Sequence, residues 1–203
     1  MNYAPIILFV YKRLDHLKLV IKSLKKNKEC QKSTLIIYSD SNKDMKDKHD
    51  VEQVRSFIKK IKGFKKVEIN LRRKNFGLAN NIVNGINKIF KKYEKAIILE
   101  DDIIVSSSFL KYMNSNLNLY SKYKNVASIH GYCYPLKNKN RINDFFFIKG
   151  ADCWGWGTWK RAWKKYINNA EYLLKKIQNQ KLEKEFDFNY SYPFFEMLKI
   201  TNE

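Results

Sequence analysis

The sequence predicts an α/β fold of three layers, in which a mostly parallel sheet lies between two layers of helices. Two observations predict it. Short apolar runs, typical of strands buried on both faces, alternate with segments whose apolar residues recur at helical spacing. Short strands joined by crossover helices form parallel sheets that are covered on both sides. The length of 203 residues suits one domain.

Strand and helix alternate through the first half of the chain. Strands are predicted at residues 5–11, 34–38, 67–71 and 96–99. Each of the first three is followed by apolar residues three or four positions apart, as on one face of a helix. These helical positions are Leu14, Leu17, Ile21 and Leu24, then Val51, Val54, Ile58 and Ile61, then Leu78, Ile82, Ile86 and Ile89.

The second half is less regular. Residues 106–108, all serine, can cap a helix that runs to about Tyr120. Strands are predicted at 126–129 and 145–148, on either side of a polar loop. A tryptophan-rich segment and a lysine-rich helix follow, and in the former we expect Trp159 and Trp163 to share a buried helix face. The tryptophan-rich segment spans residues 150–159, and the helix is predicted at 169–185.

Composition and charge limit the class of protein. The chain is 44% hydrophobic, which excludes disorder, and its longest apolar run, residues 3–11, is far shorter than the ~18 residues of a membrane span. Three cysteines are too few and too scattered for a disulfide framework or zinc site, so we expect a cytosolic protein. Forty Lys and Arg against 20 Asp and Glu give 40 − 20 = +20. We interpret this as a general lysine excess that also favours an anionic membrane surface, and a nucleic-acid-binding protein is the alternative.

Three adjacent carboxylates, Glu100, Asp101 and Asp102, follow directly on the fourth strand. Neighbouring carboxylates repel one another, so their gathering calls for a counter-charge. A divalent Mn²⁺ or Mg²⁺ ion with oxygen ligands is the obvious candidate, whereas an exposed acidic turn is the alternative. Ligands of parallel sheets bind beyond the carboxyl ends of the strands, which favours the ion.

The other strand ends also carry polar side chains. Tyr11 and Arg13 follow the first strand, and Asp40 ends the second. A basic run from Arg72 to Lys74 follows the third strand and leads into a helix start at 75–78, where free backbone N–H groups can hold an anion. A metal ligand, cations for phosphates and an acid for a base or ribose together predict a pocket for a nucleoside diphosphate.

Several of these segments, in this order, match a known family. They are the opening strand, Asp40-Ser41, Asn75-Phe76-Gly77-Leu78, Ile98 to Asp102, and Trp154-Gly155-Trp156-Gly157-Thr158-Trp159. Together they resemble nucleotide-sugar glycosyltransferases of the GT-A (Rossmann-like) fold. The chain is most similar to bacterial family-2-like sugar transferases and to the N-acetylglucosaminyltransferase I type. The resemblance covers nearly the whole chain.

The resemblance implies roles for the site residues. Asp102 would be the ligand of Mn²⁺ or Mg²⁺, and Glu100 and Asp101 would contact the donor. Asp40 would read the base, and Arg72 would lie near the donor. Tyr11, Arg13, Asn75 and Gly77 complete the expected donor-binding set. One departure is the absence of an arginine at 80–85, where many family-2 enzymes have one.

The acceptor side needs a base, since an inverting enzyme removes the proton of the acceptor hydroxyl. Glu196 is the first candidate, by resemblance, and Asp152, beside the tryptophan-rich segment, is the second. Asp187 is a third. Trp154 and Trp156 are candidates for stacking on an acceptor sugar, with core packing as the alternative.

The expected function is therefore metal-dependent, inverting transfer of a hexosyl or N-acetylhexosaminyl group from a nucleotide sugar, typically UDP-linked. The acceptor would be a saccharide, lipid-linked or protein hydroxyl in surface polysaccharide or glycoconjugate synthesis. We expect one domain, 1–203, with a donor half at 1–105 and an acceptor half at 106–203 that looks short beside its relatives. A truncated chain that binds donor only is one alternative. A nucleotidyltransferase is another, though that class carries a glycine-rich loop where this chain has Tyr11-Lys12-Arg13.

Overall fold

The computed structural model describes residues 2–135 and 145–201, and the chain forms two compact units. Residues 1–133 and 152–164 make the first, which we call the sheet unit. Residues 134–151 and 165–203 make the second, which we call the helical unit. The single domain with halves that meet at residue 105 stays a prediction. No helix in the described part of the chain is long and apolar enough to cross a membrane.

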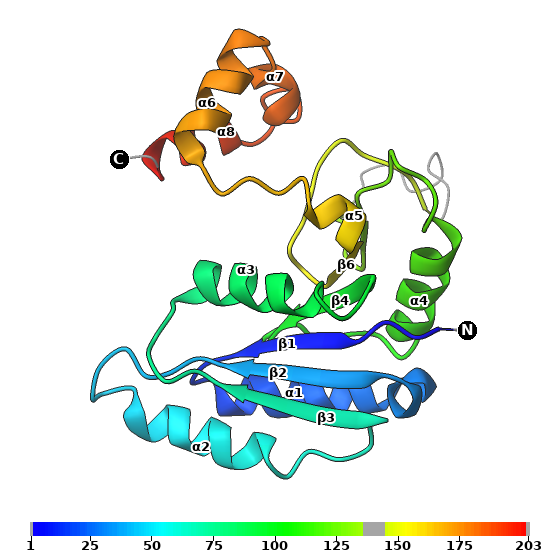
Figure 1. The fold of residues 1–203 in the computed structure, drawn as a ribbon, viewed down its shortest axis with the longest axis vertical. Helices are drawn as coiled ribbons and strands as arrows, with labels where there is room; N and C mark the ends of the chain where they lie inside the picture. The colour runs from blue at the N-terminus through cyan, green and yellow to red at the C-terminus, as the bar shows by residue number, and fades with distance from the viewer. Residues whose placement is uncertain (1, 136–144, 202–203) are drawn as a thin grey trace. The chain divides into compact units, whose positions relative to one another are not determined.

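The sheet unit alternates strands and helices as predicted (Figure 1). Its strands are β1 (Ile6–Val10), β2 (Thr34–Ser39), β3 (Lys66–Leu71), β4 (Lys95–Glu100), β5 (Ser128–His130) and β6 (Trp156–Trp159). Its helices are α1 (Leu14–Lys25), the short 3-10 helix η1 (Lys28–Lys32), α2 (Lys48–Ile58), α3 (Leu78–Ile89), α4 (Phe109–Leu119) and α5 (Lys160–Trp163). The four strands and four helices predicted between residues 5 and 120 are therefore confirmed.

The six strands form one mixed sheet in the order β3-β2-β1-β4-β6-β5. Strands β1 to β4 are mutually parallel where they pair, and β6 pairs antiparallel with both β4 and β5. Each of these strands is joined to the next in the chain through a helix, because a parallel connection must cross from one end of the sheet to the other. The predicted α/β class with a mostly parallel sheet is confirmed.

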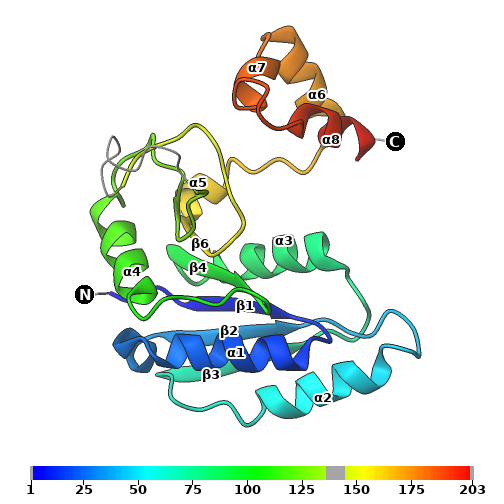
Figure 2. The same cartoon turned by 180° about the vertical axis from the view of Figure 1, so that it is seen from behind.

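Helices cover both faces of this sheet (Figures 1 and 2). Alternate residues of β1 point to opposite faces, so Ile6 and Leu8 enter one core while Ile7 and Phe9 enter the other. The first core also contains side chains of α1, α2 and α4, and the second those of α3. All five residues of β1 are buried, which explains the uninterrupted apolar run at the start of the chain.

The last four residues of the tryptophan-rich segment form strand β6, which the sequence analysis did not predict. In β6, Trp156 packs beside the core on the α3 face, whereas Trp159 is 3% exposed in the opposite core and donates its ring N–H to the carbonyl of Leu117 at 3.0 Å. Trp163 lies in α5 and packs on the same side as Trp156. The expectation that Trp159 and Trp163 share a helix face is therefore wrong, because the strand ends between them.

The helical unit contains α6 (Ala170–Asn179), α7 (Glu183–Phe186) and α8 (Phe194–Ile200). The single helix predicted at 169–185 is divided, and Lys181, with φ of 54°, makes the turn between its two parts. The strand predicted at 145–148 is wrong: these residues are exposed and form no sheet pairing among the described residues. A strand is stable only when its N–H and C=O groups find partners. The predicted polar loop at 137–143 lies outside the described residues.

Candidate active site

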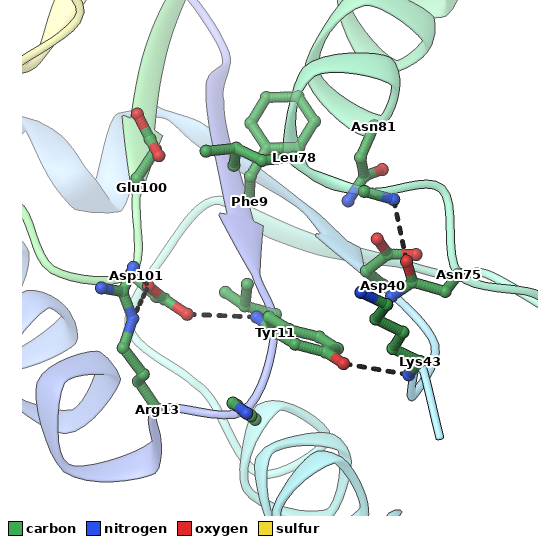
Figure 3. A pocket seen from close by; sticks show the side chains of 13 residues that line it. Phe9, Tyr11, Arg13, Asp40, Lys43, Asn75, Leu78, Asn81, Glu100 and Asp101 are labelled. Atoms are coloured by element: carbon green, nitrogen blue, oxygen red, sulfur yellow. Dashed lines mark hydrogen bonds and ion pairs between the residues drawn. The ribbon is translucent and has the colours of Figure 1, made fainter. Parts of the chain in front are cut away.

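A pocket of about 430 Å³ opens at the carboxyl ends of β1, β2 and β4, where the sequence predicted a ligand site. Figure 3 shows Glu100 and Asp101 on one side, Asp40, Asn75 and Lys43 on the other, and Tyr11 between them. Three cations, three carboxylates and the start of α3 contribute to its wall. The lining residues are Phe9, Val10, Tyr11, Lys12, Arg13, Asp40, Lys43, Asn75, Gly77, Leu78, Asn81, Glu100 and Asp101.

Asp101 ties the end of β4 to the loop that follows β1. One carboxylate oxygen accepts the backbone N–H of Tyr11 at 3.1 Å, and the other accepts Nε and Nη2 of Arg13 at 2.9 and 2.5 Å. The Asp101 residue is only 2% exposed. Burial raises the pKa of Asp101 above its usual value, and the Tyr11 N–H and the Arg13 guanidinium counter only part of that rise.

Arg13 also reaches the neighbouring Asp102, with Nη1 at 2.9 Å from a carboxylate oxygen. A single guanidinium thus bridges both aspartates, and it supplies the counter-charge that the sequence analysis assigned to a metal ion. The Asp102 side chain is 43% exposed, so one face of its carboxylate is open to solvent. Arg13 is suited to this position because its planar fork presents several N–H donors at once.

Glu100 faces away from this cluster. It lies opposite Phe9 in the β1–β4 register and two residues after Ile98, on the sheet face that α3 covers. Burial raises the pKa of Glu100, and the negative charges of Asp102 and Asp101 raise it further. Glu100 therefore differs chemically from Asp101, since no cation pairs with it in the described part of the chain.

On the opposite side of the pocket, Asp40 organises the loop that leads into α3. Asp40 is 4% exposed, and its Oδ1 accepts the N–H groups of Ser41 and Phe76, both at 2.9 Å. Asn75 donates to the carbonyl of Ser41 at 2.6 Å and accepts the Gly77 N–H at 3.1 Å. Gly77 has φ of 70°, a conformation that favours glycine, and it directs the first turn of α3 to the pocket.

Arg72 does not line the pocket. Its side chain stacks between the rings of Tyr38 and Phe76, with the guanidinium carbon 4.8 and 4.5 Å from their centroids. Nε and Nη1 donate at 2.9 Å to the side chains of Asn81 and Asn84 on α3. Burial lowers the pKa of Arg72. These contacts fix α3 against the sheet, and the donor contact implied for Arg72 stays a prediction.

The loop after β2 is held by the residues that follow β1. The hydroxyl of Tyr11 donates to Asp47 at 2.5 Å and accepts the backbone N–H of Lys43 at 3.0 Å. Lys12 pairs with the same Asp47 carboxylate at 2.6 Å. Lys43 and Asn81 line the pocket but were missed in the sequence analysis, because they lie two and three residues beyond the motifs that it singled out. Leu78 also lines the pocket, and it was quoted only as part of the helix start.

Strand β6 brings the tryptophan-rich segment to the acidic triplet. Ile98 is opposite Trp156 in the antiparallel β4–β6 register, so the residues before β6 run beside those after β4. Burial raises the pKa of the Cys153 thiol, and the charges of Glu100, Asp152 and Asp102 raise it further. Cys153 therefore lies within electrostatic range of the triplet, and Asp152 precedes it in the chain.

The two acceptor-side tryptophans differ in their surroundings. Trp154 is 48% exposed and meets Tyr132 edge to face, with ring centroids 4.7 Å apart, and its N–H donates to Asp152 at 2.8 Å. Trp156 packs against the core on the α3 face, as the alternative interpretation expected. Neither lines the pocket. A partly exposed ring can stack on a sugar, whereas a packed one serves the fold.

Glu196 belongs to the helical unit. It lies in α8, its side chain is 63% exposed, and it accepts Lys199 Nζ at 2.6 Å. Asp187, in the same unit, is 8% exposed and accepts the N–H of Phe195 at 2.7 Å, so it caps α8. The catalytic role of Glu196 stays a prediction.

The carboxylates of the triplet fit a hard divalent ion in donor chemistry. Mg²⁺ and Mn²⁺ bound with nucleotides use one or two protein carboxylates, while phosphates and waters fill the remaining positions. Asp102 is accessible, and Glu100 has no cationic partner among the described residues. Within residues 2–135 and 145–201 no three His, Cys, Asp or Glu side chains group closely enough to hold a metal by themselves.

No known protein-family profile matches the chain, and no curated protein matches it. Among solved structures, it is distantly similar to S. aureus TarS, with TM-score 0.42 and 14% identity over 60% of this chain and 20% of that one. A mannosyltransferase, PcManGT from Pyrobaculum calidifontis in complex with GDP-Man and Mn²⁺, gives TM-score 0.44 and 12% identity over 63% and 35% of the two chains. A 4-diphosphocytidyl-2C-methyl-D-erythritol synthase from Anaerococcus prevotii gives 0.46 and 9% over 86% and 83%. The chain thus spans about a third or less of the length of the first two proteins. The description of the fold rests on the strand pairing and core contacts given above.

Proposed function

We propose that this protein transfers a sugar from a nucleoside-diphosphate sugar, with UDP as the expected nucleotide, to an acceptor hydroxyl with inversion at the anomeric carbon. The bond between that carbon and the diphosphate oxygen breaks, and a bond to the acceptor oxygen forms. The diphosphate leaves with the bonding electrons, and a carboxylate takes the acceptor proton. The acceptor would belong to a surface polysaccharide or glycoconjugate.

One observation carries this proposal: the pocket joins carboxylates, cations and a helix start at the carboxyl edge of a parallel sheet. Asp40 and Asn75 would meet the nucleoside side of the donor, since they lie across the pocket from the triplet. Lys12 and Lys43 supply charge for the diphosphate. The first N–H groups of α3, which no side chain caps, add donors for an anion.

Asp102 would hold a Mn²⁺ or Mg²⁺ ion, with donor phosphates and waters as its other ligands. Such an ion offsets the charge that develops on the leaving diphosphate. Arg13 competes with it for Asp102, because both need the same carboxylate oxygens. Arg13 therefore pairs with both aspartates of the triplet when no ion is bound.

Two carboxylates are proposed as the base. Asp152 precedes Cys153, which lies within electrostatic range of the triplet, and it accepts the N–H of the partly exposed Trp154. Glu196 rests on the resemblance of its sequence surroundings. The base must meet the acceptor hydroxyl on the side away from the diphosphate, since displacement with inversion is in line.

Isothermal titration of the full chain with UDP, GDP and CDP, each with and without Mn²⁺, tests donor binding. We expect binding of one nucleotide to require the metal and to be lost in Asp102→Asn. Asp15→Asn is the matched control, because Asp15 is an exposed carboxylate on α1 with a side chain that is 92% exposed. Nucleotide binding that is equally strong without metal, or unchanged in Asp102→Asn, would refute the metal site.

A transfer assay then separates the two bases. The base variant should keep nucleotide affinity and lose turnover by about 10²–10⁴-fold, as general-base removal does. We compare Asp152→Asn with Glu196→Gln, each against wild type. Turnover at the wild-type rate in both variants would place the base elsewhere.

A further inference from the structure

The amino edge of the parallel sheet, on the side away from the pocket, carries a dense group of lysines. They follow α1 and α2 and precede β2 and β3, within the ranges 25–32 and 59–66. Nine of these sixteen residues are lysines, and Glu29 is the one acid, so 9 − 1 gives +8 of the total +20. We call this group the lysine edge. Its members are Lys25, Lys26, Lys28, Lys32, Lys59, Lys60, Lys62, Lys65 and Lys66.

Two hydrogen bonds and a side-chain contact hold the two ranges together as one surface. The N–H of Lys65 donates to the carbonyl of Ser33 at 3.1 Å, and the thiol of Cys30 donates to the carbonyl of Gly63 at 3.3 Å. The Lys25 side chain runs past Gly63, where a Cβ would lie 3.5 Å from its Cε. Residues far apart in sequence therefore present their charges on a single face of the sheet unit.

These charges are exposed and mostly uncompensated. All nine lysines are exposed. Only Lys66 forms an ion pair with a described residue, to Glu68 at 2.8 Å. Lysines at the carboxyl ends of α1 and α2 interact favourably with the helix dipoles, and this interaction accounts for Lys25 and Lys59. The helix dipoles do not account for the lysines in η1 and in the loop before β3. Like charges are therefore concentrated there at a cost in electrostatic repulsion.

We propose that the lysine edge docks the protein on an anionic lipid bilayer. A bilayer surface requires a density of positive charge and no particular hydrogen-bonding geometry, which matches a surface of flexible lysines. The two ranges contain no arginine, and their one aromatic residue, Phe64, packs on the core. Base stacking and bidentate contacts, on which most sequence readers of nucleic acids rely, are thus lacking here.

The direction of the strands gives this surface a second property. Strand β2 spans six residues between the lysine edge and the pocket, or about 20 Å at ~3.3 Å per residue. A protein docked through its lysine edge would keep the pocket open to solvent, where a charged nucleotide could enter. The sequence analysis expected membrane contact from the net charge, and the topology gives it a location. The proposal does not depend on the proposed reaction.

Sedimentation of the full chain with vesicles tests the proposal. The vesicles are phosphatidylcholine alone, or phosphatidylcholine and phosphatidylglycerol in equal parts. The edge variant replaces Lys25, Lys28, Lys62 and Lys65 by Gln. The control variant makes the same change in charge at the carboxyl side of the sheet unit, at Lys18, Lys46, Lys48 and Lys74, which are exposed and do not line the pocket.

We expect wild type to bind only the anionic vesicles and to release them as salt is raised. The edge variant should bind roughly 600-fold more weakly, since each of the four lysines near such a surface changes affinity about fivefold. The control variant should lose far less, and Lys→Arg at the four edge positions should restore binding. Equal losses in the two variants, no binding by wild type, or tighter binding to duplex DNA through the same lysines at the same salt would overturn the proposal.

Discussion

Replacing Arg13 by Gln tests whether its guanidinium supplies the positive charge that stabilises Asp101 and Asp102. The change removes two N–H bonds to a nearly buried Asp101 carboxylate, at 2.9 and 2.5 Å, and the ion pair to Asp102. Hydrogen bonds to charged groups contribute about 1.5–3 kcal/mol each, and leaving a buried charge unpaired costs about 3–5 kcal/mol. Because the Arg13 side chain is 45% exposed, water replaces part of this interaction. We expect a loss of about 2–3 kcal/mol in the free energy of unfolding at pH 7.

Urea denaturation followed by circular dichroism measures this loss. With a slope of about 2 kcal/mol per molar urea, the midpoint should fall by about 1 M. Arg13 stabilises Asp101 only when Asp101 is ionised, so the difference between wild type and variant should shrink as pH falls through the pKa of Asp101. Lys18→Gln, which removes an exposed pair with Asp15, is the control and should cost less than about 0.5 kcal/mol. A loss in Arg13→Gln that is no larger than the control, or that does not change with pH, refutes the reasoning.

The same variant tests competition with a divalent ion. Without Arg13, the two aspartates have no cationic partner in the described part of the chain. Added Mn²⁺ should therefore raise the urea midpoint of Arg13→Gln more than that of wild type, because a ligand stabilises the state that binds it. An equal rise in both proteins would contradict competition between Arg13 and the ion.

Four further changes probe the pocket wall and the packing of α3 behind it. Glu100→Gln should stabilise the protein at pH 7, because the raised pKa of Glu100 means that the folded state disfavours its ionised carboxylate. The gain in the free energy of unfolding should vanish as pH falls below the usual pKa near 4.5. Urea titrations of wild type and variant at pH 7 and pH 4 measure this difference. Asp40→Ala should lower the melting temperature, at a cost of about 1–3 kcal/mol, since the N–H groups of Ser41 and Phe76 lose their acceptor; an unchanged melting curve would contradict this. Gly85→Ala should cost about 1–3 kcal/mol, because its Cβ would lie 2.6 Å from Phe9. Gly77→Ala should also cost about 1–3 kcal/mol, because its φ of 70° and ψ of 162° form a conformation that is almost confined to glycine; an unchanged thermal unfolding curve in either variant would be evidence against the reason given for it.

The sequence by itself determined the alternation of strands and helices up to residue 120. Apolar spacing of two kinds and strand-end polar residues are local properties, and β1 through α4 follow them. It also indicated where a pocket would lie, since the carboxyl ends of parallel strands meet at one edge. Asp40 and Asp101 were both identified from their positions after strands, and both line the pocket.

Only the tertiary structure decided how charges and rings are paired. The partner of Asp101 is Arg13, 88 residues earlier, and no local pattern reports such a contact. Arg72 looked like a phosphate ligand in sequence, yet its guanidinium is held between two rings and two asparagines. The last four residues of the tryptophan-rich segment became a strand because their N–H and C=O groups pair with the edge of β4. A segment of four residues cannot satisfy these groups by itself. Pairing depends on which segments meet in space, and that is settled by the packing of the whole sheet.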